Sequence, residues 1–424
     1  MTPRGRFGLV IHVNSRHVIF VSYPGFGHIK PTLAVASELI RRGHRVTYVV
    51  TDHYADRIVA ATGARVLSYH SLIPDAGQTE AQLDDTTMVL GLIKENWAPA
   101  AKALTGLADD PPDVVVHDVL VAATAKLLCR QFGAALVAGY LIGAMNEAMM
   151  AELAVPDVDY AGPRFLQLYA DILAEVRPWG VANLMDVVLD GPFPSRNLVF
   201  LPRTFQLEAD TFDDTYRFVG PCLSDAEREQ SWLPADPARQ LVLASLGTSP
   251  SSHREAFLRT CVRAADGQPW QLVVILGNLT DPEELGALPD NVTVLPWLPH
   301  TAALPYAAGF VTHGGMGSMM EALSFGVPML VAPDTKEQRS NAERAVELGL
   351  ARELPRPRRE MTPELLGQLV TGLLADRDLR RRAHAMRTEI DRCGGAVEAA
   401  DELLALAASR PFLPTGRAEK SGAA

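Results

Sequence analysis

The sequence is poor in cysteine, in long apolar runs and in positive charge, and each shortage excludes a class of protein. Its four cysteines (Cys129, Cys222, Cys261 and Cys393) are scattered without a CxxC pair, which argues against a disulfide framework and a zinc site. No apolar run reaches the roughly 18 residues of a membrane-spanning helix. The net charge of −11 lacks the basic excess of a nucleic-acid-binding surface.

The N-terminus carries a weak likeness to a signal peptide. Residues 4–13, RGRFGLVIHV, place two basic residues before a short apolar stretch. However, no small-residue cleavage site follows, and the stretch runs directly into a strand pattern. Together with the scattered cysteines, this predicts a reduced, cytoplasmic protein.

Two series of short β-branched runs, separated by helical segments, divide the chain. A length of 424 residues already favours two domains of roughly 200 residues each. Continuous apolar strands alternating with helices are typical of parallel sheets covered on both faces. We therefore expect an α/β protein of two doubly wound, Rossmann-like domains facing across a cleft. The expected strands are residues 17–23, 45–51 and 113–118 in the first half, and 240–247, 270–277, 291–297, 309–313 and 328–333 in the second.

Polar, proline and glycine residues replace the periodic pattern between 218 and 240. We expect a first domain over 1–218, a linker over 219–240, a second domain over 241–410 whose last helix can pack back on the first, and a disordered tail over 411–424. In the first domain, a helix near 31–42 should end at Gly43, and residues 75–190 should be mostly helical.

Methionines cluster at residues 145–153, MNEAMMAEL. Methionine at helical spacing is usually core filler, but flexible thioethers also suit an adaptable wall for a bulky apolar ligand. The sequence leaves both open.

The loop YPGFGHIKP, residues 23–31, follows the first strand. Gly25 and Gly27, with Asp52 at the end of the second strand, resemble part of a dinucleotide-binding motif. Lys30 and Pro31 stand where the third glycine is expected, so the motif is incomplete. A nicotinamide oxidoreductase is thus a weak alternative.

His28 lies in the same loop, at the sheet edge where open α/β sheets bind ligands. A histidine titrates near neutrality and can accept a proton. Asp118 ends another expected strand, and an acid there can hydrogen-bond the ring and stabilise the imidazolium. His117, its neighbour, should point to the opposite face.

The second half holds a glycine-rich loop, THGGMGS, over residues 312–318. Small residues before a helix let backbone N–H groups approach a phosphate. The loop offers Gly315 and Gly317, with His313 and Ser318 as side-chain donors. Other residues that fit a nucleoside diphosphate are Thr248 after a neighbouring strand, Glu321 for a ribose diol, and Trp297, followed by Leu298, for stacking on a base.

In combination, the run from Trp297 to Gln338 resembles the sugar-nucleotide signature of UDP-dependent glycosyltransferases of the GT-B fold. It is most similar to the bacterial macrolide type, the oleandomycin glycosyltransferase type. GFGHIKPTLAVASELIRRGHRVTYVVT, from residue 25, and LPRTFQLEADTFDDTYRFVGP, over 201–221, share the likeness, which covers nearly the whole chain.

The resemblance implies a role for each residue. The first domain would bind the acceptor and the second the donor. Trp297 would stack on uracil, with Leu298 beside it. His313 and Ser318 would bind the diphosphate, and Glu321 would bind the ribose. Glu337 and Gln338 would bind the donor sugar, and His28 with Asp118 would remove the proton. The sequence departs from the pattern at His300, where glutamine is common, at Gly317, where plant relatives have asparagine, and at Glu337, where aspartate is frequent.

The implied reaction is an inverting transfer of a hexose from a UDP-sugar to a hydroxyl of a hydrophobic small molecule such as a macrolide, another polyketide or a phenol. Glucose is the expected hexose. The UDP-sugar is a co-substrate, and no cofactor or metal is expected. The Asp157–Asp159 pair resembles a metal-binding motif but lacks a preceding strand. A homodimer is compatible with the sequence, and a nucleotide-sugar binder or UDP-sugar epimerase of the same fold is the alternative.

Overall fold

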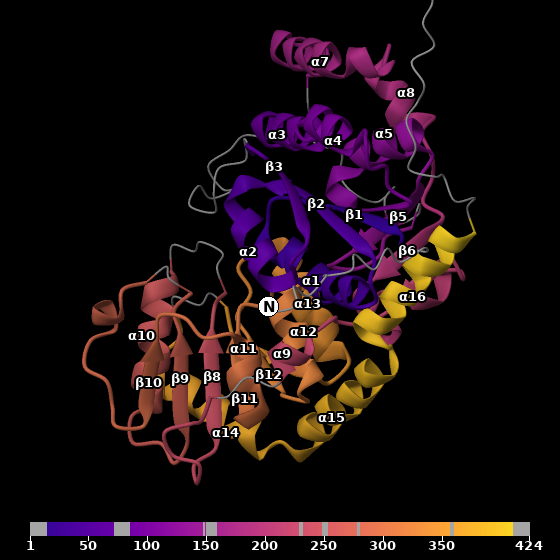
Figure 1. The fold of residues 1–424 in the computed structure, drawn as a ribbon. Helices are drawn as coiled ribbons and strands as arrows, with labels where there is room; N and C mark the ends of the chain where they lie inside the picture. The colour runs from indigo at the N-terminus through magenta and orange to yellow at the C-terminus, as the bar shows by residue number, and fades with distance from the viewer. Residues whose placement is uncertain are drawn as a thin grey trace, which may run out of the picture.

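The computed structural model describes residues 15–71, 85–146, 149, 159–228, 232–247, 253–277, 280–356 and 360–409. Two sheets follow one another along the chain (Figure 1). The first has seven strands in the order β3-β2-β1-β4-β5-β6-β7, and the second has six in the order β10-β9-β8-β11-β12-β13. Neighbouring strands pair in parallel in both. The fold is therefore the predicted α/β architecture of two doubly wound domains.

The strands are short, apolar and mostly buried. Those of the first sheet are β1 (His17–Val21), β2 (Arg45–Thr51), β3 (Arg65–Tyr69), β4 (Val114–Asp118), β5 (Ala135–Tyr140), β6 (Arg196–Val199) and β7 (Tyr216–Phe218). Those of the second are β8 (Leu241–Ser245), β9 (Gln271–Ile275), β10 (Val292–Leu295), β11 (Ala307–Thr312), β12 (Met329–Val331) and β13 (Ala351–Glu353).

The strand order reverses direction once in each sheet, between β1 and β4 and between β8 and β11. At such a switch point the connections leave the strands toward opposite sides, which opens a crevice at the carboxyl ends where α/β proteins bind ligands. We therefore expect the candidate site at the two switch points.

Helices cover both faces of each sheet (Figure 1). In the first domain they are α1 (Phe26–Arg41), α2 (Asp52–Thr62), α3 (Asp85–Trp97), α4 (Ala100–Leu107), α5 (Ala122–Phe132), α7 (Pro163–Val176) and α8 (Leu184–Leu189). They continue with α9 (Asp225–Arg228), α10 (Arg254–Ala265), α11 (His300–Ala303), α12 (Met316–Ser324), α13 (Lys336–Glu347), α14 (Pro363–Ala375), α15 (Arg377–Arg392) and α16 (Gly395–Ala408). Single 3₁₀ turns are η2 (Val119–Val121), η3 (Arg177–Trp179), η4 (Arg203–Phe205), η5 (Ala209–Thr211), η6 (Pro282–Leu285) and η7 (Leu304–Tyr306).

One expectation on the first domain was wrong. The first helix begins at Phe26 instead of near residue 31, so Pro31 lies inside it and the expected loop around His28 is already helical. Pro31 is the sixth residue of α1, beyond the first turn, so it removes the N–H group that would otherwise pair with the carbonyl of Gly27. The described part of the stretch 75–190 is mostly helical, as expected, although β5 also lies within it. Gly43 ends α1 as predicted, with a positive φ of 86°.

The last helix belongs to the core of the first domain. Ala399, Ala400, Leu403 and Ala407 of α16 are buried in one cluster with residues of β1 and β2. α16 also packs along α1, as Figure 1 shows at the yellow end of the chain. Apolar burial of this kind is the main stabilising contribution to a core. The C-terminal segment thus returns to cover the sheet of the first domain.

A second core joins the two domains. Phe205 and Phe212 of the first domain lie in one buried cluster with Leu243 and Met320 of the second. The Arg344 guanidinium of α13 donates hydrogen bonds to backbone oxygens of residues 204–206 at 2.7, 3.1 and 3.3 Å. The domains are therefore held together by apolar packing and by hydrogen bonds. No helix in the described part of the chain is long and apolar enough to cross a membrane.

Candidate active site

His28 and Asp118 form a hydrogen-bonded pair at the first switch point. The Nδ1 atom of His28, on the first turn of α1, lies 2.6 Å from Oδ2 of Asp118 at the end of β4. The other carboxylate oxygen, Oδ1, accepts the backbone N–H of Leu120 at 2.9 Å. Since both oxygens of Asp118 are held, the ring of His28 is fixed with Nδ1 as the donor, and Nε2 is the nitrogen that can accept a proton.

The surroundings favour the charged form of His28. Burial acts to lower its pKa, but the hydrogen bond and charge of Asp118, helped by the charge of Glu337, raise the pKa above its ordinary value of 6.5. The side chain is 23% exposed whereas that of Asp118 is 3% exposed, so the ring remains accessible. His117 lies on the α5 side of β4, where burial and Lys126 lower its pKa.

The second switch point is shaped by glycine. Gly314, after β11, has a φ of 88°, a conformation that side-chain-bearing residues rarely adopt. A Cβ on Gly315 would lie 2.5 Å from Nε2 of His313, and one on Gly247, after β8, would lie 2.7 Å from Cε1 of the same ring. The glycines thus allow the buried His313 ring to lie against the backbone of both loops.

The N-terminus of α12 opens beside His313. Gly315 is its N-cap, and because glycine has no side chain, the N–H groups of the first turn remain available to an anion. Gly317 is exposed and the partly buried Ser318 lies in the same turn. This arrangement can hold a diphosphate. Thr248, the remaining predicted phosphate contact, lies outside the described residues.

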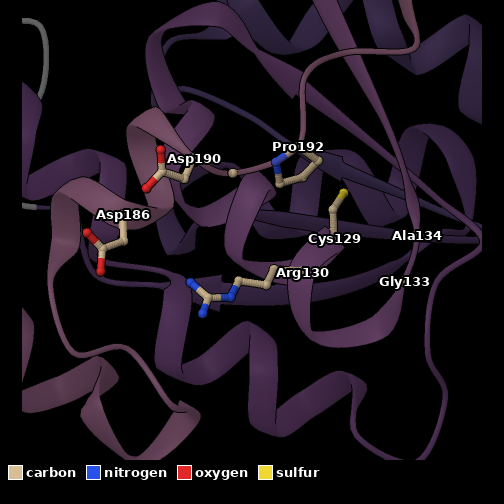
Figure 2. Close-up of a pocket in the computed structure, with 8 residues that line it drawn as sticks. Cys129, Arg130, Gly133, Ala134, Asp186, Asp190 and Pro192 are labelled. Carbon is tan, nitrogen blue, oxygen red and sulfur yellow. The ribbon is translucent and has the colours of Figure 1, made fainter.

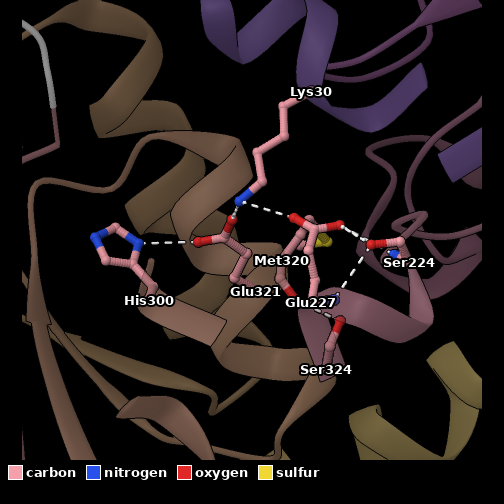
Figure 3. Close-up of polar contacts among 7 residues, drawn as sticks. All are labelled: Lys30, Ser224, Glu227, His300, Met320, Glu321 and Ser324. Atoms are coloured by element: carbon pink, nitrogen blue, oxygen red, sulfur yellow. Dashed lines mark hydrogen bonds and ion pairs between the residues drawn. The ribbon is translucent and has the colours of Figure 1, made fainter. Parts of the chain in front are cut away.

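Glu321 lies one turn deeper in α12 and is bound from both sides (Figure 3). Its Oε1 pairs with Nζ of Lys30 on α1, and its Oε2 lies 2.9 Å from Nδ1 of His300. Burial acts to raise the pKa of Glu321, but Lys30 and His300 lower it from 4.5 to about 2. Glu321 is therefore an ionised, buried carboxylate, and Lys30 also lies 3.4 Å from Glu227 of α9.

Glu337 and Gln338 begin α13 but have different surroundings. Glu337 is exposed, accepts a hydrogen bond from Asn341 at 3.1 Å and lies close enough to affect the pKa of His28. Gln338 is buried, and its amide oxygen accepts the N–H groups of Asp334 and Thr335 in a capping box. Only its amide nitrogen can therefore serve a sugar hydroxyl.

Trp297 lies after β10 with 43% of its surface exposed, and Leu298 packs on the core that joins the domains. The guanidinium of Arg57, on α2, lies 5.6 Å from the centre of the Trp297 ring and 3.3 Å from that of Phe26. Sequence reasoning missed Arg57, Lys30 and Glu227, since no motif pointed to contacts between the domains.

Of the other candidates, Asp52 and Asp159 have partners outside this group. Asp52 is exposed and lies 3.3 Å from His70. Asp159 accepts the N–H of Ala161, while Asp157 is outside the described residues. Of the methionines at 145–153, Met149 packs on the core that joins the domains. Met145 lies within the described residues and Met150 lies outside them.

A cavity of about 510 Å³ also lies elsewhere, as Figure 2 shows. Its wall includes Arg130 of α5, Asp186 and Asp190 at α8, and Ala134 just before β5. Because Ala134 precedes its strand, this cavity lies at the amino-terminal edge of the first sheet, opposite His28.

Comparison with known proteins agrees with this geometry. Residues 270–406 match the family model of the erythromycin biosynthesis protein CIII-like, C-terminal domain. The chain is 32% identical over 391 residues to the NDP-glycosyltransferase YjiC of Bacillus subtilis (strain 168), covering 91% of this chain and 96% of that protein. It is 36% identical over 399 residues to the oleandomycin glycosyltransferase of Streptomyces antibioticus, covering 91% and 89%.

Solved structures extend the agreement to three dimensions. CalG4, the calicheamicin glycosyltransferase, superposes with a TM-score of 0.78 at 33% identity, over 93% of this chain and 99% of that one. The likeness thus spans both domains and the linker between them. The chain belongs to the family of nucleotide-sugar-dependent glycosyltransferases with the GT-B fold, and it is a glycosyltransferase.

Proposed function

We propose that this glycosyltransferase moves a hexose from a UDP-sugar to a hydroxyl group of a hydrophobic natural product, with inversion at the anomeric carbon. The hexose that we propose is glucose. The observation that carries the proposal is the His28–Asp118 pair on the first domain, with 2.6 Å between Nδ1 and Oδ2. The charge of Glu337, on the second domain, helps to raise the pKa of His28. A proton acceptor on one domain thus faces a sugar-binding acid on the other.

The residues support a single displacement. Nε2 of His28 takes the proton of the acceptor hydroxyl while that oxygen forms a bond to the anomeric carbon. The bond from this carbon to the diphosphate oxygen breaks, and the diphosphate leaves with the electron pair. Attack from the opposite face turns an α-linked donor into a β-glycoside. A positioned base contributes about 10² to 10⁴ in rate, and Asp118 stabilises the imidazolium.

The leaving group would be held at the second switch point. His313, Ser318 and the N–H groups at the start of α12 supply donors toward the diphosphate, and such fixed donors lower the barrier most where negative charge develops. Residues 241–410 would thus bind the nucleotide sugar and residues 1–218 the acceptor.

The nucleotide is proposed to be uridine. Glu321 can accept both ribose hydroxyls, whereas a 2′-deoxyribose offers one. The loss of one hydrogen bond to a buried carboxylate costs about 1 to 3 kcal/mol, so UDP-sugars should be preferred over TDP-sugars roughly tenfold to a hundredfold. Glu337 and the amide nitrogen of Gln338 suit a sugar that keeps its 3- and 4-hydroxyls, which supports glucose.

The acceptor class is proposed from relatives. The similar proteins named above carry the names of oleandomycin and calicheamicin. We extend this to macrolides, other polyketides and phenols as acceptors of this chain.

Incubation with UDP-glucose and a panel of such acceptors tests the proposal. We expect products heavier by one hexose, with a β linkage by NMR. Hydrolysis or epimerisation of UDP-glucose without transfer to any acceptor would contradict it, and an α linkage would overturn the single displacement.

A further inference from the structure

Three residues of the first domain face three residues of the second in a matching order. His28 lies within electrostatic reach of Glu337, Lys30 pairs with Glu321, and Arg57 lies over Trp297. His28 and Lys30 are on α1, whereas Arg57 is on α2. The facing residues of the second domain are those proposed for the sugar, the ribose and the base, in the order in which these groups are joined in a nucleotide sugar.

We propose that Lys30 and Arg57 are donor-contacting residues, so that the first domain binds the nucleotide as well as the acceptor: Lys30 at the diphosphate, and Arg57 at the base. The inference rests on the proposed function, because it takes the roles of Glu321 and Trp297 from it.

Lys30 has the charge and the position for the diphosphate end. Its side chain is 26% exposed, and its ammonium lies between Glu321 and Glu227. Figure 3 shows the side chain extending from α1 to both carboxylates. Ser318 precedes Glu321 by three residues on α12, which places the two on one face of the helix, a turn apart. The flexible stem of lysine spans such a distance.

The pairing with Glu321 leaves room for the ribose. An ionised carboxylate has about four lone-pair sites, and Lys30 and His300 fill two of them. The ribose hydroxyls can therefore bind Glu321 while the ammonium remains beside it. A diphosphate brings negative charge to the same position, so Lys30 gains a partner on donor binding that a neutral nucleoside does not provide.

Arg57 has the geometry for the base end. Its guanidinium stacks on Phe26 at 3.3 Å and approaches the exposed ring of Trp297 at 5.6 Å. A flat cation over an aromatic ring can stack equally on a nucleobase. A base on Trp297 would have the guanidinium at its edge or its other face.

Calorimetric titration of UDP and of uridine distinguishes the two contacts. For Lys30→Met we expect UDP affinity to fall at least about tenfold while uridine affinity stays within threefold of wild type. For Arg57→Met we expect both to weaken by the same small factor, about twofold to fivefold. Lys102→Met, an exposed lysine on α4, is the matched control and should change neither.

Two further variants keep the test independent of folding defects. Lys30→Arg preserves the charge and should keep the ratio of UDP to uridine affinity near that of wild type. Glu227→Gln removes one competing carboxylate and should strengthen UDP binding without strengthening uridine binding.

An unchanged UDP-to-uridine ratio in both Lys30→Met and Glu227→Gln would overturn the role of Lys30, and wild-type affinities in Arg57→Met would overturn that of Arg57. These outcomes differ from failure of the proposed function, in which wild type itself would bind no UDP and transfer no hexose.

Discussion

The two switch points have the same topology but different chemistry. Each carries a histidine just after a central strand or at the start of the helix that follows it. His28 is paired with a carboxylate and keeps an accessible ring, whereas His313 is buried against the backbones of Gly247 and Gly315. The acid at the second point, Glu321, pairs with Lys30 and His300. We therefore propose proton transfer at the first position and anion binding at the second.

The largest effect should come from removing the proton acceptor at the first point. His28→Ala should lower turnover at least about a hundredfold because no group replaces Nε2 as the base. UDP binding should be nearly unchanged, since most of the proposed donor contacts lie in the second domain. Steady-state kinetics and calorimetry measure both, and turnover close to wild type on an alcohol acceptor would refute the role.

The next prediction concerns the second switch point. Gly315→Ala places a methyl group where the His313 ring lies, so the ring must move and its contact with the diphosphate is lost. We expect UDP affinity to fall roughly tenfold to a hundredfold. Gly91→Ala, on α3, is the control, because a Cβ there meets nothing within 4 Å and lies outside the proposed donor site. Equal losses in the two variants would show that His313 is not the cause.

Asp118→Asn sharpens the comparison through pH. A histidine base works in its neutral form, so kcat/KM should rise with pH through the pKa of His28. Asp118 raises this pKa, and its neutral replacement should move the rising limb to lower pH while lowering the plateau about tenfold. A pH–rate profile decides this. An unshifted limb would mean that the carboxylate does not act on the ring.

Glu321→Ala gives the smallest predicted change. The variant loses the acceptor for the ribose hydroxyls, so the preference for UDP-glucose over TDP-glucose should shrink to within about threefold. Competition between the two donors on one acceptor measures the preference. If wild type itself prefers TDP-glucose, the ribose role of Glu321 is wrong.

Local patterns were enough to predict much of this molecule. The β-branched runs at β1, β2 and β4 and at β8–β12 stand between glycine, proline and polar residues, and the same runs placed Asp118 and His313 at strand ends. The strands β3, β5, β6, β7 and β13 were not among those expected. For β5, ALVAGY at 135–140 is a short apolar run whose periodicity does not separate strand from buried helix. The start of α1 was missed because glycines and Pro31 are typical of a loop.

Contacts between the domains could not be predicted. Lys30 and Glu321 are 291 residues apart in the chain, and their pairing depends on how two separately patterned domains sit together. Gln338 shows a related limit, since the sequence pair with Glu337 does not reveal that its oxygen caps α13. The donor contacts proposed for Lys30 and Arg57 therefore could not be predicted from the sequence.

The packing of α16 on the first sheet sets an order of events during synthesis. Ribosomes extend chains at about 5–20 residues per second, so the roughly 180 residues between β7 and α16 take on the order of 10 to 35 s to make. Throughout that interval the face over Val18 and Phe20 lacks the helix that buries it. The domain that is translated first is therefore completed last, and a chain cut before Gly395 would leave this apolar face open to aggregation.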